Sequence, residues 1–149
     1  MDQIDRKILK ALQANARASL QEISQAVGLS SSPCWERIRK LEQSGVIEGY
    51  TVRLNALGLG LPDTVLVQLT LDSHTDNTLE KFGETLAAIP EVIEAYLVSG
   101  EYDYLLRVAV KDTRDYERLL RERLYKIKGI RHSKSSFVLR TLKKADLPL

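Results

Sequence analysis

The sequence predicts an α+β protein of two parts, an N-terminal winged helix-turn-helix followed by a ferredoxin-like βαββαβ domain. Apolar residues recur at helical spacing through the first 43 residues. A stretch with two glycines and a proline, Asn55–Asp63, then interrupts that spacing. Beyond it, strand-like alternation of apolar residues appears four times, with helical spacing between some of the strands. We therefore predict a first domain over residues 1–55, a hinge over 56–63 and a second domain over 64–149.

Residues 19–50 predict two helices joined by a tight turn. Ser19 and Glu22 have the spacing of a capping box, so a helix is expected to begin there. Gly28 ends it, because glycine turns the chain left-handed without a Cβ clash. Three serines followed by Pro33 are typical of the start of the next helix. This is the helix-turn-helix arrangement.

The second of these helices has two chemically different faces. Cys34, Ile38 and Leu41 share one face and are expected to pack on the preceding helices. The opposite face is polar; its short hydroxyls can approach phosphates or base edges, and its cations can neutralise phosphates. An ordinary surface helix with a solvated polar face would show the same pattern. The predicted DNA-binding residues are Ser31, Ser32, Trp35, Glu36, Arg39, Lys40 and Arg53.

The flanking segments favour DNA binding over the ordinary surface helix. Asp2 is expected to cap a first helix, which completes a three-helix core. Val46–Leu54 alternates apolar and polar residues, as a short β-ribbon would. A three-helix core followed by a ribbon is a winged helix-turn-helix, and double-stranded DNA is therefore the expected partner.

Composition narrows the class of protein. The formal net charge of +2 argues against a purely electrostatic nucleic-acid binder. Residues 1–55 hold 8 Lys or Arg against 6 Asp or Glu, whereas residues 56–149 hold 14 of each. No apolar run approaches the ~20 residues that span a bilayer, and the first residues do not have the pattern of a signal peptide. A cytoplasmic protein without a membrane partner is expected.

The residues that commonly bind metals are few. The chain has one cysteine, Cys34, and two histidines, His74 and His132, far apart in sequence. No metal site and no cofactor are predicted. A single cysteine also forms no internal disulfide, which suits a reducing compartment.

The second domain is predicted to follow the order βαββαβ. The expected elements are a strand over 65–71, a helix capped by Thr75 or Asp76 and ended by Pro90, strands over 92–98 and 105–110, a helix capped by Asp112 or Thr113 and ended by Gly129, and a strand over 135–142. Such a fold places both helices on one face of an antiparallel sheet.

The other face of the sheet is expected to be covered by a second copy of the chain. Apolar residues occupy both alternating sets in the second strand, with Leu97 placed in the middle of the sheet and Tyr96 on the other set. Strands that are apolar on both faces are buried on both faces. Because a helix-turn-helix commonly binds two half-sites as a dimer, a homodimer is predicted.

Four stretches of the sequence resemble the Lrp/AsnC (feast/famine) family of transcription regulators. They are IDRKILKALQANAR at 4–17, LQEISQAVGLSSSPCWERIRKLEQSGVIEGY at 20–50, PEV at 90–92 and GEYDYLLRV at 100–108. The resemblance covers both domains. It implies a transcriptional regulator whose second domain is a RAM domain, pairing through its sheet into dimers that assemble further, often into octamers. It also implies an amino acid as effector, and the SSPCWERI segment resembles regulators of cysteine, methionine and branched-chain amino acid metabolism.

The resemblance further implies an effector site where RAM domains meet. A carboxylate such as Asp103 can hold an α-ammonium group, and a glycine turn exposes backbone donors for an α-carboxylate. A plain hairpin turn would look the same without the resemblance. Ser135 and Ser136 stand where many relatives have threonine, which leaves the ligand open. The implied effector-binding residues are Gly100, Glu101, Tyr102, Asp103 and Tyr104 on the turn, with Ser133, Ser135 and Ser136 opposite them.

Two other classes of protein, an enzyme and a pure assembly scaffold, agree less well with the sequence. Catalysis would need a nucleophile with an oriented base, or paired carboxylates in a pocket. Cys34 lies on the expected core face of a helix, and nothing orients Asp103 and Tyr104 for acid-base work. We therefore predict that the protein is not an enzyme. A pure assembly scaffold would leave the capped helix and its predicted wing unexplained.

Overall fold

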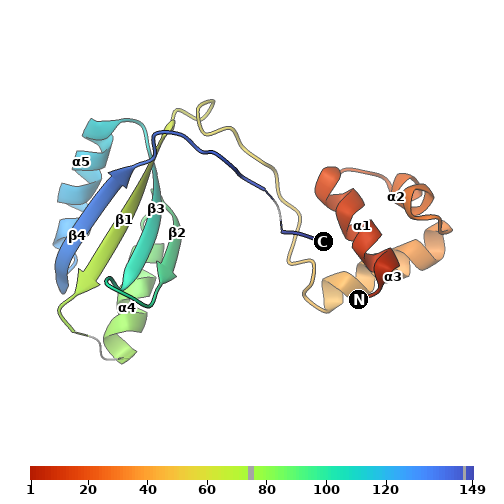
Figure 1. Cartoon of the computed structure of the whole chain (residues 1–149), viewed down its shortest axis with the longest axis horizontal. Coiled ribbons are helices and arrows are strands. Elements are labelled where there is room, and N and C mark those ends of the chain that lie inside the picture. Colours follow the sequence, from red (N-terminus) through yellow and green to blue (C-terminus); the bar gives the residue numbers. More distant parts are fainter. Residues whose placement is uncertain (74–75, 146) are drawn as a thin grey trace. The chain divides into compact units, whose positions relative to one another are not determined.

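The structure, a computed structural model, describes residues 1–73, 76–145 and 147–149 (Figure 1). The chain divides into two compact units. Unit 1 comprises Met1–Arg53 and Lys143–Leu149, and unit 2 comprises Leu54–Leu142. Residues Lys143–Leu149 group with unit 1, although they follow unit 2 in the sequence. The reason is local contact, because Gln13 Nε2 donates to the carbonyl of Leu147 at 3.2 Å and Leu149 packs on the core of unit 1.

Unit 1 is built on three helices (Figure 1). They are α1, Gln3–Ala14, α2, Leu20–Val27, and α3, Ser31–Gln43. Asp2 and Asp5 form a reciprocal capping box at the start of α1, and Ser19 and Glu22 form one at the start of α2. Gly28 ends α2 in the left-handed region with φ of 74°. The predicted caps and the glycine turn are confirmed.

The three helices enclose a small apolar core. Cys34 and Ile8 are fully buried in it, and Ile38 packs against it, as the helical spacing predicted. Burial raises the pKa of the Cys34 thiol, because a thiolate is poorly solvated there. The buried residues of this core are Ile8, Leu9, Ile23, Val27, Cys34 and Leu41.

The predicted ribbon is wrong. The segment from Val46 to Leu54 is irregular and pairs with no strand in the described parts of the chain. It is attached to unit 1 by two hydrogen bonds, from Ile47 N–H to the Leu41 carbonyl at 3.1 Å and from the Tyr50 hydroxyl to Glu42 at 2.8 Å, and by the packing of Ile47 against the core. Alternation alone could not form a ribbon, because a strand is stable only when a neighbouring strand accepts its hydrogen bonds.

Unit 2 has the predicted order βαββαβ around a four-stranded antiparallel sheet, in the order β2-β3-β1-β4. The strands are β1, Asp63–Leu71, β2, Val92–Leu97, β3, Tyr104–Val110, and β4, Ile130–Phe137. The helices are α4, Asp76–Ala87, α5, Thr113–Glu122, and a short 3-10 helix η1, Leu124–Lys126. Asp112 caps α5 by accepting the N–H of Asp115 at 2.8 Å, which confirms that predicted cap.

Both α-helices cover one face of this sheet (Figure 1). Side chains of β1 and β3 at alternate positions are fully buried beneath them, because successive strand residues point to opposite faces. This face carries the apolar core of unit 2: Val65, Val67, Leu69, Leu71, Phe82, Leu86, Ile89, Tyr104, Leu106, Val108, Val110, Tyr116, Leu119 and Leu124. Among the described residues no helix is long and apolar enough to cross a membrane.

The last strand differs from the prediction. It runs from Ile130 to Phe137, not over residues 135–142. The partner strand sets these limits, since β4 pairs with β1 from Leu71↔Ile130 to Val65↔Phe137 and β1 begins only at Asp63. The predicted cap Thr75 and the histidine His74 lie outside the described residues.

The face of the sheet that carries no helix is mixed in character. A register shift between Val92 and Glu94 places Leu97 opposite Tyr104 on the helix-covered face, in the edge strand β2. Leu97 is 60% exposed, so its predicted place in the middle of the sheet is wrong. The helix-free face instead carries Tyr96 and the ion pair between Glu94 and Arg107. It is therefore less uniformly apolar than the sequence pattern indicated.

Leu106 and Leu97 differ in burial, so replacing each by alanine should lower the free energy of unfolding by different amounts. Leu106→Ala should lower the free energy of unfolding by about 2–5 kcal/mol, because it empties a fully buried place between sheet and helices. Leu97→Ala should cost clearly less in the same protein, since most of that side chain already meets solvent. Urea unfolding followed by circular dichroism measures both. Equal losses for the two variants would mean that Leu97 is buried in the assembled protein.

Candidate DNA interface and ligand site

Helix α3 presents the predicted DNA-contacting residues on one exposed face. Cys34 and Leu41, on the other side, are buried against α1 and α2. The N-cap residue Ser30 makes no side-chain capping bond, so the positive end of the helix has no side-chain acceptor from its own cap. Such an end is suited to meet a phosphate. The exposed residues of this face are Ser31, Ser32, Trp35, Glu36, Arg39 and Lys40.

Trp35 and Arg39 interact on this face. The Arg39 guanidinium carbon lies 5.4 Å from the centroid of the Trp35 ring, which is a cation–π distance. Trp35 is 51% exposed although it is the largest apolar side chain in the chain. Stacking restricts the rotamers of Arg39, so less entropy is lost when its planar fork meets a base or phosphate.

Arg53 lies apart from this face in the sequence. It lies within the irregular segment in which the ribbon was predicted, and it is exposed. The Tyr50–Glu42 hydrogen bond is the nearest attachment to α3. Burial, and secondly the bond to Glu42, raise the pKa of Tyr50, so its hydroxyl stays protonated and remains a donor at neutral pH.

Arg37 of α3 makes an ionic contact that the sequence analysis did not predict. Its Nη1 lies 2.6 Å from Asp2 Oδ2 and 2.7 Å from Asp5 Oδ1. These are the two carboxylates of the α1 capping box, which also accept each other's backbone N–H groups at 2.8 and 2.9 Å. The guanidinium therefore fastens α3 to the first turn of α1.

Charge holds this three-residue cluster together. Hydrogen bonds from the Asp5 backbone and then from Arg37 lower the pKa of Asp2, while the two carboxylates raise the pKa of Arg37. Two carboxylates at one helix start repel each other unless a cation lies between them. The cluster sets the position of α3 on α1, and with it the position of the exposed face. The D-x-x-D spacing at Asp2 and Asp5 was the available signal.

The turn between β2 and β3 contains four of the residues implied to bind an effector. Gly100 has φ of 132°, and Val98 N–H donates to the Asp103 carbonyl at 2.9 Å to close the turn. Asp103 also joins this turn to the end of β1. Its N–H donates to the Leu69 carbonyl at 2.9 Å and its Oδ2 accepts the N–H of Leu71 at 2.7 Å.

Tyr104 belongs to the core. It is 3% exposed, its hydroxyl donates to the Leu79 carbonyl at 2.5 Å, and its ring centroid lies 5.4 Å from that of Phe82. Burial raises the pKa of Tyr104, in keeping with a neutral hydroxyl that serves as a structural donor.

The three serines of β4 divide between the two faces of the sheet. Ser133 and Ser135 pair with Leu69 and Val67, whose side chains point to the helices, whereas Ser136 pairs with Leu66 on the helix-free face. Ser135 Oγ lies 2.5 Å from the Tyr116 hydroxyl of α5. One copy of unit 2 therefore brings the turn near the start of β4 but does not gather all the implied residues into one cluster.

Both units match models of known protein families. The model described as Lrp/AsnC ligand binding domain matches residues 64–148, and the model described as winged helix-turn-helix DNA-binding matches residues 1–48. The chain belongs to the Lrp/AsnC family. It is a DNA-binding transcriptional regulator of the Lrp/AsnC type and not an enzyme, as the sequence predicted.

Individual relatives of this Lrp/AsnC regulator agree over nearly its whole length. The leucine-responsive regulatory proteins of Escherichia coli K12 and Klebsiella pneumoniae are each 39% identical over 146 residues, 98% of this chain and 89% of theirs. An AsnC family transcriptional regulator from Agrobacterium tumefaciens has a TM-score of 0.94 at 38% identity, covering 99% and 97% of the two chains. A Neisseria meningitidis transcriptional regulator in complex with L-Met has a TM-score of 0.93 at 32% identity, covering 99% and 96%.

The Arg37 cluster predicts a positioning effect on DNA binding. Arg37→Gln should weaken operator binding on the order of tenfold while the slope of log affinity against log salt stays unchanged, because Arg37 faces α1 and not the DNA. In an Asp2→Asn, Asp5→Asn background the same change should have little further effect. A phosphate-contacting Arg37 would give the opposite result, with stronger binding in the Asn background and a shallower slope after Arg37→Gln.

The same cluster predicts a pH dependence of stability. Since the folded pKa of Asp2 is below its ordinary value of 3.8, its contribution is present above that pH and is lost as the pH falls through the lowered pKa. Arg37→Gln should reduce this loss. Melting temperatures recorded along an acid series for both proteins measure the difference, and identical curves would contradict the assignment.

Two residues on the exposed face of α3 are expected to weaken DNA binding in different ways when each is replaced by alanine. Arg39→Ala should cost about 1–3 kcal/mol of specific binding and relax the preference for the operator if Arg39 reads a base. Lys40→Ala should weaken operator and unrelated DNA alike and lower the salt slope by about 1. Gel shifts or fluorescence anisotropy on both DNAs separate these outcomes, and unchanged affinity in the double variant would remove α3 from the interface.

Proposed function

We propose that this regulator binds an amino acid through unit 2 and that binding changes its hold on operator DNA, so that it controls genes of amino acid metabolism. The observation that supports this most directly is the similarity, over 99% of the chain, to a regulator in complex with L-Met. The curated relatives are named leucine-responsive regulatory proteins. An aliphatic amino acid such as methionine or leucine is therefore the effector class we favour.

On the DNA side, the exposed face of α3 is proposed to enter the major groove. Ser31, Ser32, Trp35, Glu36 and Arg39 would face the base edges, with Lys40 and Arg53 nearer the phosphates. The exposure of the α3 residues and the stacking of Arg39 on Trp35 support this arrangement.

On the effector side, the turn from Val98 to Asp103 has the groups that an amino acid needs. Within the described residues the N–H groups of Gly100, Glu101 and Tyr102 make no hydrogen bond. Neighbouring backbone N–H groups at a glycine turn form a concave site for a carboxylate. The carboxylate of Asp103 supplies a negative charge for the α-ammonium group. We propose that the turn holds both charged ends of the effector.

The serines of β4 suggest how a second copy could complete the site. Ser133 of β4 lies beside Leu69 of β1, the strand to which the turn is attached. Ser135 is engaged by Tyr116, and Ser136 lies on the helix-free face. We propose a homodimer formed through that face, assembling to a higher oligomer such as an octamer and acting in the cytoplasm. The exposed Leu66 and Tyr96 on the face support the pairing, since exposed apolar side chains gain most from being covered.

Two substitutions separate the proposed role of Asp103 from its structural role. Asp103→Asn keeps a carbonyl oxygen that can accept the Leu71 N–H, but it removes the charge; Asp103→Ala removes both. Calorimetry with methionine and leucine should show about 10-fold or greater loss of affinity for Asp103→Asn with little change in melting temperature. Asp103→Ala should lose affinity and stability together. Full affinity in Asp103→Asn would mean that Asp103 attaches the turn to β1 but does not hold the effector.

The response itself is tested by linkage. If the effector changes operator affinity by some factor, operator DNA must change effector affinity by the same factor. Titration of effector with and without operator measures this. No binding of any amino acid by the native protein would reduce unit 2 to an assembly domain and leave DNA binding by unit 1 untouched.

A further inference from the structure

Residues 56–149 hold equal numbers of basic and acidic residues, but the two kinds are separated along the sequence. Residues 54–122 hold 6 Lys or Arg against 13 Asp or Glu. Residues 123–145 hold 8 Lys or Arg and no Asp or Glu. A solvated surface usually intersperses the two signs of charge. The change at residue 123 therefore places a block of positive charge on the last elements of unit 2.

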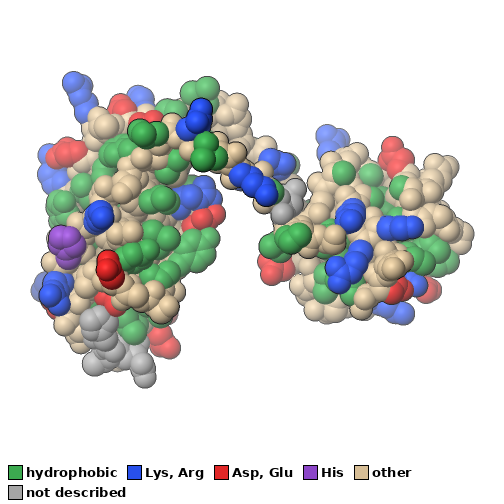
Figure 2. Space-filling model, in the orientation of Figure 1, with side chains coloured by type: hydrophobic (Ala, Val, Ile, Leu, Met, Phe, Trp, Pro, Cys, Tyr) green, Lys and Arg blue, Asp and Glu red, His purple; other side chains and the backbone are tan. Residues whose placement is uncertain are grey.

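Most of this block lies at one edge of the sheet. It begins after α5, continues through η1 and the turn at Gly129, and follows β4, which is an edge strand. Figure 2 shows Lys and Arg side chains on either side of the purple histidine along this edge. We call the set the basic edge. Its members, all exposed, are Arg123, Lys126, Lys128, Arg131 and Lys134.

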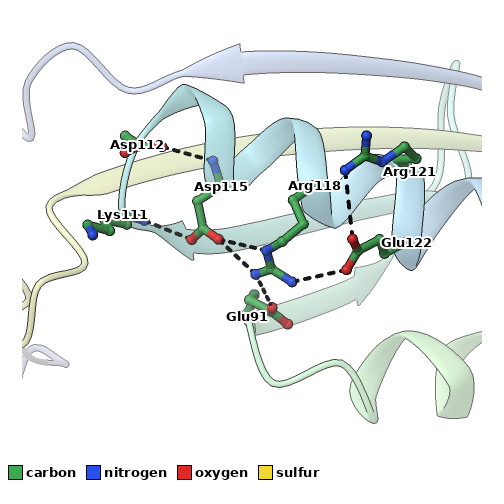
Figure 3. A network of polar contacts seen from close by, with 7 residues as sticks. All are labelled: Glu91, Lys111, Asp112, Asp115, Arg118, Arg121 and Glu122. Carbon is green, nitrogen blue, oxygen red and sulfur yellow. Dashed lines mark hydrogen bonds and ion pairs between the residues drawn. The ribbon is translucent and has the colours of Figure 1, made fainter.

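The carboxylates of unit 2 do not neutralise the basic edge. Arg118 on α5 is surrounded by Glu91, Asp115 and Glu122 at 3.0, 2.7 and 3.6 Å (Figure 3). The pKa of Arg118 is raised by Asp115 first and then by Glu91, so these carboxylates are engaged by Arg118 and not by the basic edge.

The remaining ion pairs follow the same division. Glu94 pairs with Arg107, and Arg121 pairs with Glu117 and Glu122. Within the described chain no member of the basic edge makes an ion pair. One acidic residue, Asp72, is bonded to this part of the chain through its backbone, since its N–H donates to the Gly129 carbonyl at 2.9 Å.

Protection of an edge strand explains only part of this charge. Lysines on edge strands discourage pairing with other chains, and Lys134 and Arg131 fit that role. Arg123, Lys126 and Lys128 lie in the connection between α5 and β4, where no strand edge needs protection. Five cations that make no ion pair among the described residues, on β4 and on the connection leading into it, are therefore suited to a polyanion.

We propose that the basic edge is a second DNA-binding surface, which contacts phosphates of the DNA that α3 recognises. The inference rests on the proposed function of α3. DNA is the polyanion that an Lrp/AsnC regulator meets. Residues 1–55 supply an excess of only two cations for it. Arg131 and Lys134 are three residues apart on β4, roughly 10 Å along an extended strand, so the edge can reach more than one phosphate of the DNA backbone. These contacts would add affinity without adding sequence preference.

Matched charge-neutralising variants test the proposal. Lys126→Gln, Lys128→Gln, Arg131→Gln removes three cations of the basic edge, and Lys81→Gln, Lys111→Gln, Arg114→Gln removes three exposed cations elsewhere in unit 2. Operator affinity is measured from about 50 to 200 mM salt. The basic-edge variant should lower the salt slope by roughly 2–3, since each phosphate contact contributes about 0.9. The control should leave the slope nearly unchanged.

Three outcomes would overturn the proposal. An unchanged slope in the basic-edge variant means that these side chains do not meet phosphates. Equal changes in both variants mean that only the net charge matters. A loss of assembly confined to the basic-edge variant, seen by light scattering at the same protein concentration, means that the edge joins copies of the chain. If the Arg39, Lys40 double variant loses binding but the basic-edge variant keeps the native salt slope, only this inference is wrong and the proposed role of α3 remains.

A measurement on the native protein avoids any question of folding. Lysine acetylation followed by mass spectrometry reports the reactivity of Lys126, Lys128 and Lys134 with and without operator DNA. Protection of these lysines, with Lys81 and Lys111 still reactive, is expected. Equal reactivity of Lys128 and Lys134 in the free protein and the complex would contradict the assignment.

Discussion

Burial and pairing of β1 support everything that unit 2 does. This strand is bonded to β3 on one side and β4 on the other, and its helix-facing residues Val65, Val67, Leu69 and Leu71 are at most 1% exposed. A central strand buried in this way cannot shift by one residue, because a shift would turn its apolar side chains to the other face. The end of β1 therefore offers a fixed frame for the turn that Asp103 attaches to Leu69 and Leu71. The proposed ligand site depends on that frame, as does the start of β4.

In unit 1 an ionic contact has the corresponding role. The small apolar core brings α3 against α1, but apolar packing alone tolerates small rotations of a helix. The bonds from Arg37 to Asp2 and Asp5 are directional and charge-assisted, and they act at the point where α1 begins. They join α3 to α1 at a defined point, and with α3 the face that carries Arg39 and Trp35. We therefore expect DNA affinity to depend on residues that do not contact DNA.

The distribution of charge differs along the chain. Residues 1–55 have an excess of only two cations for DNA, and we propose that Arg39, stacked on Trp35, is one that meets it. In unit 2 three carboxylates surround Arg118, and among the described residues the five cations of the basic edge make no ion pair. A net charge near zero is thus compatible with strong local attraction for a polyanion, because phosphates respond to the charges nearest to them at physiological salt.

The sequence by itself determined the helix starts, the turn at Gly28, the buried face of α3 and the order βαββαβ. Each of these depends on neighbours along the chain, as when Ser19 caps a helix with Glu22 three residues away. Alternation between Val46 and Leu54 predicts a ribbon that the described structure does not form, because a strand needs a partner strand that sequence spacing does not identify. The register shift after Val92, the engagement of Asp103 by β1 and the cluster at Arg37 were decided only by the tertiary structure. Those features join residues more than ten positions apart, and their energy comes from distances that exist only once the chain has folded.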